Sequence, residues 1–254
     1  MGNDVLYEQE GKIGKITLNR PDKNNSLELT TVKSLIEFFQ ISAQNEDICV
    51  ILAANGKNFT VGDDLKYSYD LINDINKLPE AVEFIGSYQT LTRSMLAHPG
   101  IIIAGLHGWT IGGGFEMLLS CDLRIAATDT KIMLPELGVG LFFSNASTKL
   151  LSRIIGLGRA KKIMLLGEEL NAEDAYNIGL VSEICKPESL DRILKKTANK
   201  ILQKSHLGLQ FGKKLLNENY DKNIEGVLDS EQLAIITAGQ SDEFKKRIQK
   251  FLKH

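Results

Sequence analysis

Several features that often reveal a protein's chemistry are scarce in this sequence of 254 residues. It has only three cysteines, Cys49, Cys121 and Cys185, which are far apart and form no CxxC pair. The four histidines share no metal-ligand spacing either, so we expect no metal site. An odd, widely spaced set of cysteines is typical of buried thiols in a reducing compartment rather than of a disulfide framework.

Neither sign of charge dominates, and no apolar run reaches the length of a membrane span. The net charge of −2 and the pI near 6.1 give no reason to expect nucleic acid or an anionic membrane as partner. The first residues contain neither the basic nor the apolar region of a secretory signal. We therefore expect a cytoplasmic globular protein without a nucleic-acid or membrane partner.

The first two thirds of the chain alternate between strand-like and helix-like patterns. Residues 11–21 alternate apolar and polar side chains, whereas residues 47–56 and 100–108 carry continuous apolar runs typical of buried strands. Residues 29–44 and 79–99 have apolar side chains at helical spacing. This alternation predicts an α/β architecture.

From about Pro187 onward the pattern changes to four helix-like segments with little strand signal. The change divides the chain into an α/β domain at residues 1–190 and a helical C-terminal region at residues 191–254. Four apolar-periodic helices carry more apolar surface than one small region can cover, so we expect this region to form contacts between subunits.

The segment HGWTIGGGFEMLLSCD, residues 107–122, places three glycines and Glu116 between two apolar runs. One interpretation is a tight strand-to-helix connection that needs glycine for conformation and packing. A second is an anion site, because the first turn of a helix offers unpaired N–H groups. A dinucleotide fingerprint fits poorly, because Met117 stands where its third glycine is required.

Two further segments favour a site for chemistry. The segment GKNFTVGDDLKYSYD, residues 56–70, follows a buried strand and also presents main chain around a glycine, Gly62. Two such loops could supply two N–H donors to one oxygen. In the segment KIMLPELGVGLFFSNAS, residues 131–147, Glu136 lies among apolar neighbours as Glu116 does. Burial raises the pKa of carboxyl groups, so the two glutamates predict paired acid–base chemistry.

Five motifs follow one another along the chain: ITLNRPDKNNSL, NFTVGDDL, GLHGWTIGGGFEMLLSCD, LPELGVGL and LGEELNAEDAYNIGLVSEI. The resemblance that they carry runs over nearly the whole chain, from about Ile13 to Leu252. Together they resemble the enoyl-CoA hydratase/isomerase (crotonase) superfamily. The resemblance implies a crotonase-like spiral of ββα units with a helical C-terminal oligomerisation region. It also implies homotrimers or hexamers and an acyl-CoA thioester substrate, in which coenzyme A is part of the substrate and no separate cofactor is needed.

The resemblance also implies roles for four residues. The N–H groups of Asp63 and Gly113 would bind the thioester oxygen and stabilise an enolate, and a side chain at Gly113 would intrude on that oxygen. Glu116 would activate the water that adds at C3, and Glu136 would deliver or remove the proton at C2. Both glutamates are present, which favours a hydratase. The alternatives are an enoyl-CoA isomerase in which Glu136 acts alone, or another crotonase-type reaction of an acyl-CoA.

By the same resemblance, the residues expected to contact the substrate are Lys23, Asn24, Lys57, Val61, Leu65, Gly112, Ser144 and Phe251. Of these, Lys23, Asn24 and the carbonyl of Val61 would hold the adenine, and Lys57 would lie near the phosphates. Two departures from the family's pattern bear on the acyl group. Asp63 replaces a small residue, and residues 143–147 replace a usual proline and glycines, with Ser144 aligned to a glycine that helps hold water.

Overall fold

Two β-sheets form the framework of the protein, which is described here from a computed structural model over residues 4–252. The larger sheet has the order β1-β2-β3-β4-β6-β9; β1 is antiparallel to β2 and the other pairs are parallel. Its strands are β1 (Val5–Glu10), β2 (Ile13–Leu18), β3 (Cys49–Ala54), β4 (Ile101–Leu106), β6 (Leu123–Ala127) and β9 (Glu183–Cys185). The smaller sheet has the order β5-β7-β8 and consists of β5 (Trp109–Ile111), β7 (Lys131–Met133) and β8 (Leu170–Asn171).

The chain winds repeatedly from the larger sheet to the smaller sheet and then into a helix. After β4 it forms β5 and then α4 (Gly112–Leu118), and after β6 it forms β7 and then the 3-10 turn η3 (Glu136–Val139). After β3, the isolated bridge between Thr60 and Thr110 extends the smaller sheet in the same way. This is the spiral of ββα units expected from the sequence.

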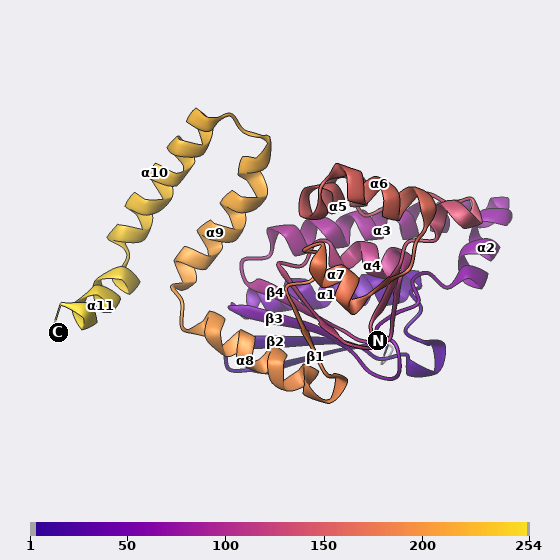
Figure 1. Ribbon diagram of the computed structural model, residues 1–254, viewed down its shortest axis with the longest axis horizontal. Coiled ribbons are helices and arrows are strands. Elements are labelled where there is room, and N and C mark those ends of the chain that lie inside the picture. The colour runs from indigo at the N-terminus through magenta and orange to yellow at the C-terminus, as the bar shows by residue number, and fades with distance from the viewer. Residues whose placement is uncertain (1–3, 253–254) are drawn as a thin grey trace.

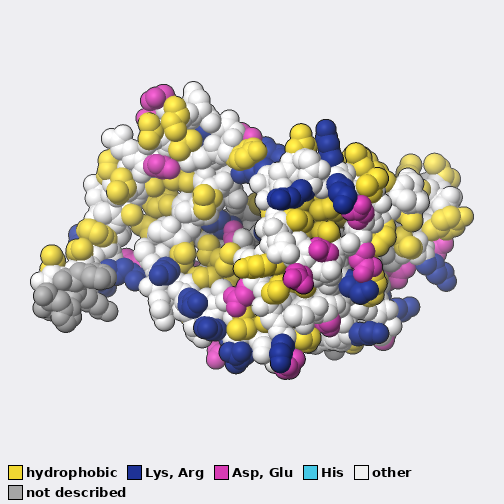
Figure 2. Space-filling view, viewed as in Figure 1, with side chains coloured by type: hydrophobic (Ala, Val, Ile, Leu, Met, Phe, Trp, Pro, Cys, Tyr) yellow, Lys and Arg dark blue, Asp and Glu magenta, His cyan; other side chains and the backbone are white. Residues whose placement is uncertain are grey.

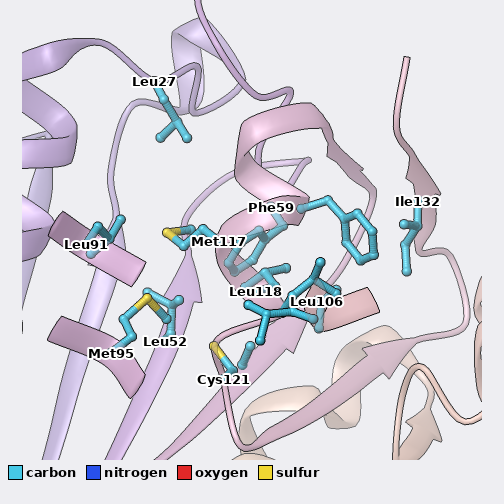
Figure 3. Close-up of a cluster of buried hydrophobic side chains, with 14 of the residues drawn as sticks. Leu27, Leu52, Phe59, Leu91, Met95, Leu106, Met117, Leu118, Cys121 and Ile132 are labelled. Atoms are coloured by element: carbon cyan, nitrogen blue, oxygen red, sulfur yellow. The ribbon is translucent and has the colours of Figure 1, made fainter. Parts of the chain in front are cut away.

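Helices cover both faces of the larger sheet (Figure 1). On one face α1 (Leu29–Gln44), α3 (Leu78–Ala97) and α4 build the larger apolar core with alternate residues of the strands. Figure 3 shows part of this core, where Leu52 of β3 lies near Met95 of α3. The opposite face is covered by α8 (Leu190–Leu202). Successive strand residues point to opposite faces, so each strand contributes to both cores.

Four more helices precede the C-terminal region, and all of them contribute buried side chains to the larger core. They are α2 (Leu65–Asn73), α5 (Ser147–Ile155), α6 (Leu157–Leu166) and α7 (Ala172–Asn177), with 3-10 turns η1 (Pro21–Lys23), η2 (Ile75–Lys77), η4 (Pro187–Ser189) and η5 (Asn219–Asp221). Among residues 4–252, no helix has both the length and the apolar character needed to cross a bilayer.

The C-terminal region is helical, as the sequence pattern indicated. Beyond α8 it contains α9 (His206–Glu218), α10 (Ile224–Gln240) and α11 (Asp242–Phe251), which extend as an arm away from the sheets (Figure 1). No residue of α10 is buried, and apolar side chains lie open on the arm (Figure 2). The first helix after residue 190, α8, packs on the sheet, so the part that projects from the body begins with α9.

Some elements and one thiol differ from what the sequence pattern indicated. Strand β1 and helix α2 were not predicted. Half of the residues of β1 are exposed, and α2 is only nine residues long, so the sequence pattern of each is short or incomplete. Cys49 and Cys121 are buried as expected, but Cys185 is only partly buried because it lies on the edge strand β9.

Candidate active site

Two glycine loops that follow β3 and β4 are in backbone contact. The N–H of Ile111 donates to the carbonyl oxygen of Thr60 at 3.0 Å, which aligns the loops. A Cβ added at Gly62 would lie 2.7 Å from the carbonyl oxygen of Ile111 and 3.4 Å from the Cα of Gly112, so a larger residue does not fit. Gly62 and Gly112 also have positive φ values of 79° and 57°. The sequence therefore needs glycine at both positions to bring main chain to main chain.

The two predicted main-chain donors are free to bind a ligand. The hydrogen bonds of residues 4–252 include none donated by the N–H of Asp63, whose neighbour Asp64 donates instead to Leu27. Gly113 lies in the first turn of α4, where an N–H group has no partner within its own helix, and it donates to no other group among those residues. Both N–H groups are therefore available to an acceptor.

The other two glycines of the GGG segment are required by neighbouring side chains. A Cβ at Gly114 would lie 2.2 Å from the Cγ2 of Thr60, which is fully buried. A Cβ at Gly113 would lie 2.7 Å from Oδ1 of Asp63 and 3.3 Å from the hydroxyl oxygen of Tyr88. A side chain added at Gly113 would therefore meet the Asp63 carboxyl group, and the expected clash with a substrate oxygen stays a prediction.

Asp63 and Tyr88 form a polar pair beside Gly113. The Tyr88 hydroxyl group of α3 donates to Oδ1 of Asp63 at 2.5 Å. Burial raises the pKa of Asp63, while the hydrogen bond from Tyr88 acts in the opposite direction. The pKa of Tyr88 is raised by burial and by the neighbouring carboxyl group, so the phenol keeps its proton and remains the donor.

Glu116 is almost fully buried, with 1% of its surface exposed, on α4. Its Oε2 atom accepts three hydrogen bonds from one loop: from the N–H of Ser144 at 3.1 Å, from the N–H of Asn145 at 3.3 Å and from the hydroxyl of Ser147. Burial raises the pKa of Glu116, and these three donors lower it. Burial is the larger effect, so the pKa of Glu116 stays above its ordinary value, and the three donors reduce the rise.

Glu136 has the opposite environment. It lies on η3 and is buried, but neither of its carboxyl oxygens has a hydrogen-bond partner among the described residues. A Cβ at Gly112 would lie 3.2 Å from Oε1 of Glu136, so this carboxyl group faces the glycine turn. The pKa of Glu136 is raised to about 7, chiefly by burial and in smaller part by the charges of Glu116 and Asp63. Both carboxyl groups therefore have raised pKa values, but only the carboxyl oxygens of Glu116 accept hydrogen bonds from other described residues.

An apolar cavity of about 350 Å³ opens beside Asp63 between α2, α3 and residues 141–144. This volume lies at the lower end of the range of small-molecule sites. Ser144, predicted to contact substrate, lies in its wall. The lining residues are Asp63, Ser68, Leu71, Ile72, Ala81, Phe84, Ile85, Tyr88, Gln89, Leu141, Phe142, Phe143 and Ser144.

The residues expected to hold the CoA moiety lie at the surface next to the first glycine loop. Asn24 is exposed at the end of η1. Its side-chain oxygen accepts a hydrogen bond from the Asn58 side chain at 3.0 Å, and its carbonyl oxygen accepts one from the N–H of Val61 at 3.2 Å. Lys23 and Lys57 are exposed on the same two loops. The structure thus brings Lys23, Asn24, Lys57 and Val61 to one surface region.

Leu65 was also predicted to contact the substrate, but it is not part of the cavity wall. It lies on the first turn of α2 and is 63% exposed, whereas Ser68 of the same helix lines the cavity. The side chain of Phe251 lies outside the described part of the structure, so its predicted contact is not addressed. Among the described residues, no group of histidine, cysteine and carboxylate side chains is placed to hold a metal ion.

Similarity to known proteins identifies the family of this chain. A model of the family described as enoyl-CoA hydratase/isomerase matches residues 8–254. The chain belongs to the enoyl-CoA hydratase/isomerase family. This family member is 30% identical over 252 residues to the short-chain-enoyl-CoA hydratase of Clostridium acetobutylicum, with 98% of this chain and 95% of that protein covered. It is 33% identical over 236 residues to the (E)-benzylidenesuccinyl-CoA hydratase of Thauera aromatica, with coverage of 90% and 88%.

The same family relationship holds at the level of the fold. The crystal structure of an enoyl-CoA hydratase from Thermoplasma volcanium superposes with a TM-score of 0.89 at 28% identity, covering 97% of this chain and 96% of that one. The family and the fold class predicted from the five sequence motifs are therefore confirmed.

Sequence reasoning did not find two side chains that shape this enoyl-CoA hydratase/isomerase-family site. Ser147 appeared only as a departure from the usual glycines, and its bond to Glu116 joins residues 31 positions apart. Tyr88 appeared only as one residue of a predicted helix. Its helical period is consistent with a buried face, but nothing local to the sequence points it toward Asp63, 25 residues away.

Proposed function

We propose that this protein is an enoyl-CoA hydratase that adds water reversibly across the 2,3-double bond of a 2-enoyl-CoA thioester. The observation that carries the proposal is the contrast between two buried carboxyl groups at one glycine turn. Glu116 accepts three hydrogen bonds that favour its ionised form, whereas Glu136 has no partner among the described residues and a pKa of about 7. One base and one acid are what addition of water requires.

The free N–H groups of Asp63 and Gly113 would receive the thioester oxygen. When the water oxygen bonds to C3, the electron pair of the double bond is delocalised onto the thioester oxygen, because the two are conjugated. Donors that the fold holds in place stabilise the resulting enolate. Removing one such donor in other enzymes costs on the order of 10²–10³ in rate. The backbone hydrogen bond between the two glycine loops, from Ile111 to Thr60, supports this arrangement because it fixes one loop against the other.

The two glutamates would then divide the proton transfers. Glu116, ionised, takes a proton from water as the water oxygen bonds to C3, and the electron pair of the double bond moves onto the enolate. Glu136, protonated below its pKa, gives its proton to C2 as the enolate collapses. Dehydration follows the same steps in reverse, with Glu136 ionised and Glu116 protonated.

A second function, isomerisation of a 3-enoyl-CoA to the 2-enoyl form, is supported by one observation. The three hydrogen bonds to Glu116 all come from residues 144–147, so Glu116 also anchors that loop. A purely structural Glu116 would leave Glu136 as the single acid–base group, which is sufficient to move one proton between C2 and C4.

Conservative variants separate the two functions. For a hydratase, Glu116→Gln and Glu136→Gln each lower hydration of a short 2-enoyl-CoA by orders of magnitude, because an amide cannot exchange the proton. For an isomerase, only Glu136→Gln is severe. Ultraviolet absorbance of the conjugated thioester, followed in oxygen-18 water, reports the reaction: loss of absorbance with label uptake indicates hydration, and gain without label indicates isomerisation.

The remaining expectations belong to the same proposal. The substrate brings its own CoA, held at Lys23, Asn24, Lys57 and Val61, and no further cofactor takes part. We also propose a cytoplasmic homotrimer or hexamer. The support is α10, which has exposed apolar side chains, including Leu233 at 67% and Ile235 at 72%, and no buried residue. Light scattering at micromolar concentration tests the assembly, and a monomer would contradict it.

A further inference from the structure

The cavity beside Asp63 is larger than a four-carbon acyl group needs. Its volume is about 350 Å³, whereas a methylene group takes about the space of a water molecule, roughly 30 Å³. The cavity therefore has room for on the order of ten carbon atoms. A crotonyl group has only a methyl group beyond C3, so most of the apolar wall would stay in contact with water, which is unfavourable.

One side of α3 forms a stripe along the cavity. Ala81, Phe84, Ile85 and Tyr88 are spaced by three and four residues, which places them on the same side of the helix, and all four line the cavity. Ala81, Phe84 and Tyr88 are buried, whereas Ile85 is 47% exposed. The stripe therefore reaches from the interior, where Tyr88 contacts Asp63, to the surface.

Other parts of the wall are apolar as well. Leu71 and Ile72 of α2 line the cavity together with Phe142 and Phe143, whose ring centroids are 5.2 Å apart. Ile72 is 49% exposed and Phe142 is 69% exposed, so this part of the wall also extends to the surface. An alkyl chain that follows the cavity outward would therefore remain against apolar side chains.

The wall offers little to a polar acyl chain. Among the described residues that line the cavity, Asp63 alone is charged, and its Oδ1 already accepts a hydrogen bond from Tyr88 at 2.5 Å. The hydroxyl oxygen of Ser68 is buried, so it is not open to a ligand. Asp63 also lies against Gly113. A thioester oxygen bound by the N–H groups of these two residues would thus have its alkyl chain next to the apolar wall.

We propose that this cavity selects enoyl-CoA thioesters with medium-length alkyl chains, of about eight to ten carbons in the acyl group, over crotonyl-CoA. The inference rests on the proposed function only in placing the thioester at Asp63 and Gly113. Burial of each additional methylene group strengthens binding by up to about fourfold. The four methylene groups that separate a four-carbon from an eight-carbon chain should therefore tighten binding by on the order of 10- to 100-fold.

Binding of saturated acyl-CoA thioesters tests the inference without any turnover. Butyryl-, hexanoyl-, octanoyl- and decanoyl-CoA are titrated into the full-length protein by calorimetry, at concentrations below those at which the longer thioesters form micelles. We expect octanoyl-CoA to bind on the order of 10- to 100-fold tighter than butyryl-CoA. The heat-capacity change of binding should become more negative with each added methylene group, because more apolar surface is buried.

Variants assign the gain in affinity to the cavity. Ala81→Leu fills room for about three methylene-sized groups, so it should reduce the gain from butyryl-CoA to octanoyl-CoA by about tenfold. Ile85→Trp narrows the cavity at a half-exposed position and serves where Ala81→Leu does not fold. Val82→Leu is the matched control, because Val82 lies on the same helix, is 65% exposed and does not line the cavity. It should keep the gain.

The inference is overturned if octanoyl-CoA binds no tighter than butyryl-CoA. It is equally overturned if the gain survives both Ala81→Leu and Ile85→Trp. Its failure is distinguishable from that of the proposed function. Hydration of crotonyl-CoA, seen as uptake of oxygen-18 label, without a gain along the saturated series leaves the hydratase proposal intact and removes this inference. A gain that depends on the cavity, without label uptake from any 2-enoyl-CoA, does the reverse.

Discussion

Replacing Glu136 by glutamine should change the stability of the protein in a pH-dependent way. The carboxyl group has a pKa of about 7 in the folded protein, raised first by burial, against an ordinary value of 4.5. One pKa unit corresponds to about 1.4 kcal/mol, so the whole shift amounts to roughly 3 kcal/mol. Because the surroundings of a buried charge relax and reduce its penalty, about 2 kcal/mol is the better expectation.

The sign follows from proton linkage. The folded protein holds the Glu136 proton more tightly than the unfolded chain, so this group's contribution to stability is fully present below pH 4.5. It is lost as the pH rises through about 7 and stays lost above that value. Glutamine has no charge at any pH. The quantity to compare is the free energy of unfolding of Glu136→Gln minus that of wild type. It should be about 2 kcal/mol larger at about pH 8.5 than at about pH 4.5.

Urea unfolding at one protein concentration measures this difference at the two pH values. Glu8→Gln is the control, because Glu8 is exposed on β1 and its replacement should have little effect at either pH. If wild type and Glu136→Gln differ by the same free energy at both pH values, the buried, unpartnered carboxyl group does not titrate as the structure indicates, and the reasoning fails.

Three further outcomes are expected. Gly114→Ala should destabilise the protein by about 1–3 kcal/mol, because the added Cβ would lie 2.2 Å from the Cγ2 methyl group of Thr60. Thr60→Ser removes this methyl group, so the double variant should recover most of the lost stability, as measured by urea unfolding. Ser147→Ala removes the side-chain donor that lowers the pKa of Glu116, so the acidic limb of the pH–rate profile should move to higher pH; an unchanged limb would contradict a catalytic Glu116. Hydration by wild type should fall above about pH 7 as Glu136 loses its proton, and a rate that stays constant to about pH 9 would exclude Glu136 as the acid.

Much of the framework was predictable because its signals are local. The apolar runs that became β3 and β4, and the helical spacing of α1 and α3, depend on periods of two and 3.6 residues that the sequence displays directly. Strand β1 was not predictable from its pattern, since it lies at the sheet edge with half of its residues exposed. The helices α9–α11 were predictable from their period. Their extension away from the sheets was not, because helical period does not determine where a helix packs.

The site divides in the same way. The sequence by itself determined that glycine turns stand beside Glu116 and Glu136, and it marked both glutamates by their apolar neighbours, which the structure buries. Their roles in catalysis stay predictions. Only the tertiary structure decided that three donors from residues 144–147 surround Glu116 and that Glu136 has none among the described residues. The hydrogen bond between Tyr88 and Asp63, which are 25 residues apart, also depends on the tertiary structure. Such contacts depend on how helices dock on the sheet, which is set by packing of the whole core rather than by any short stretch of chain.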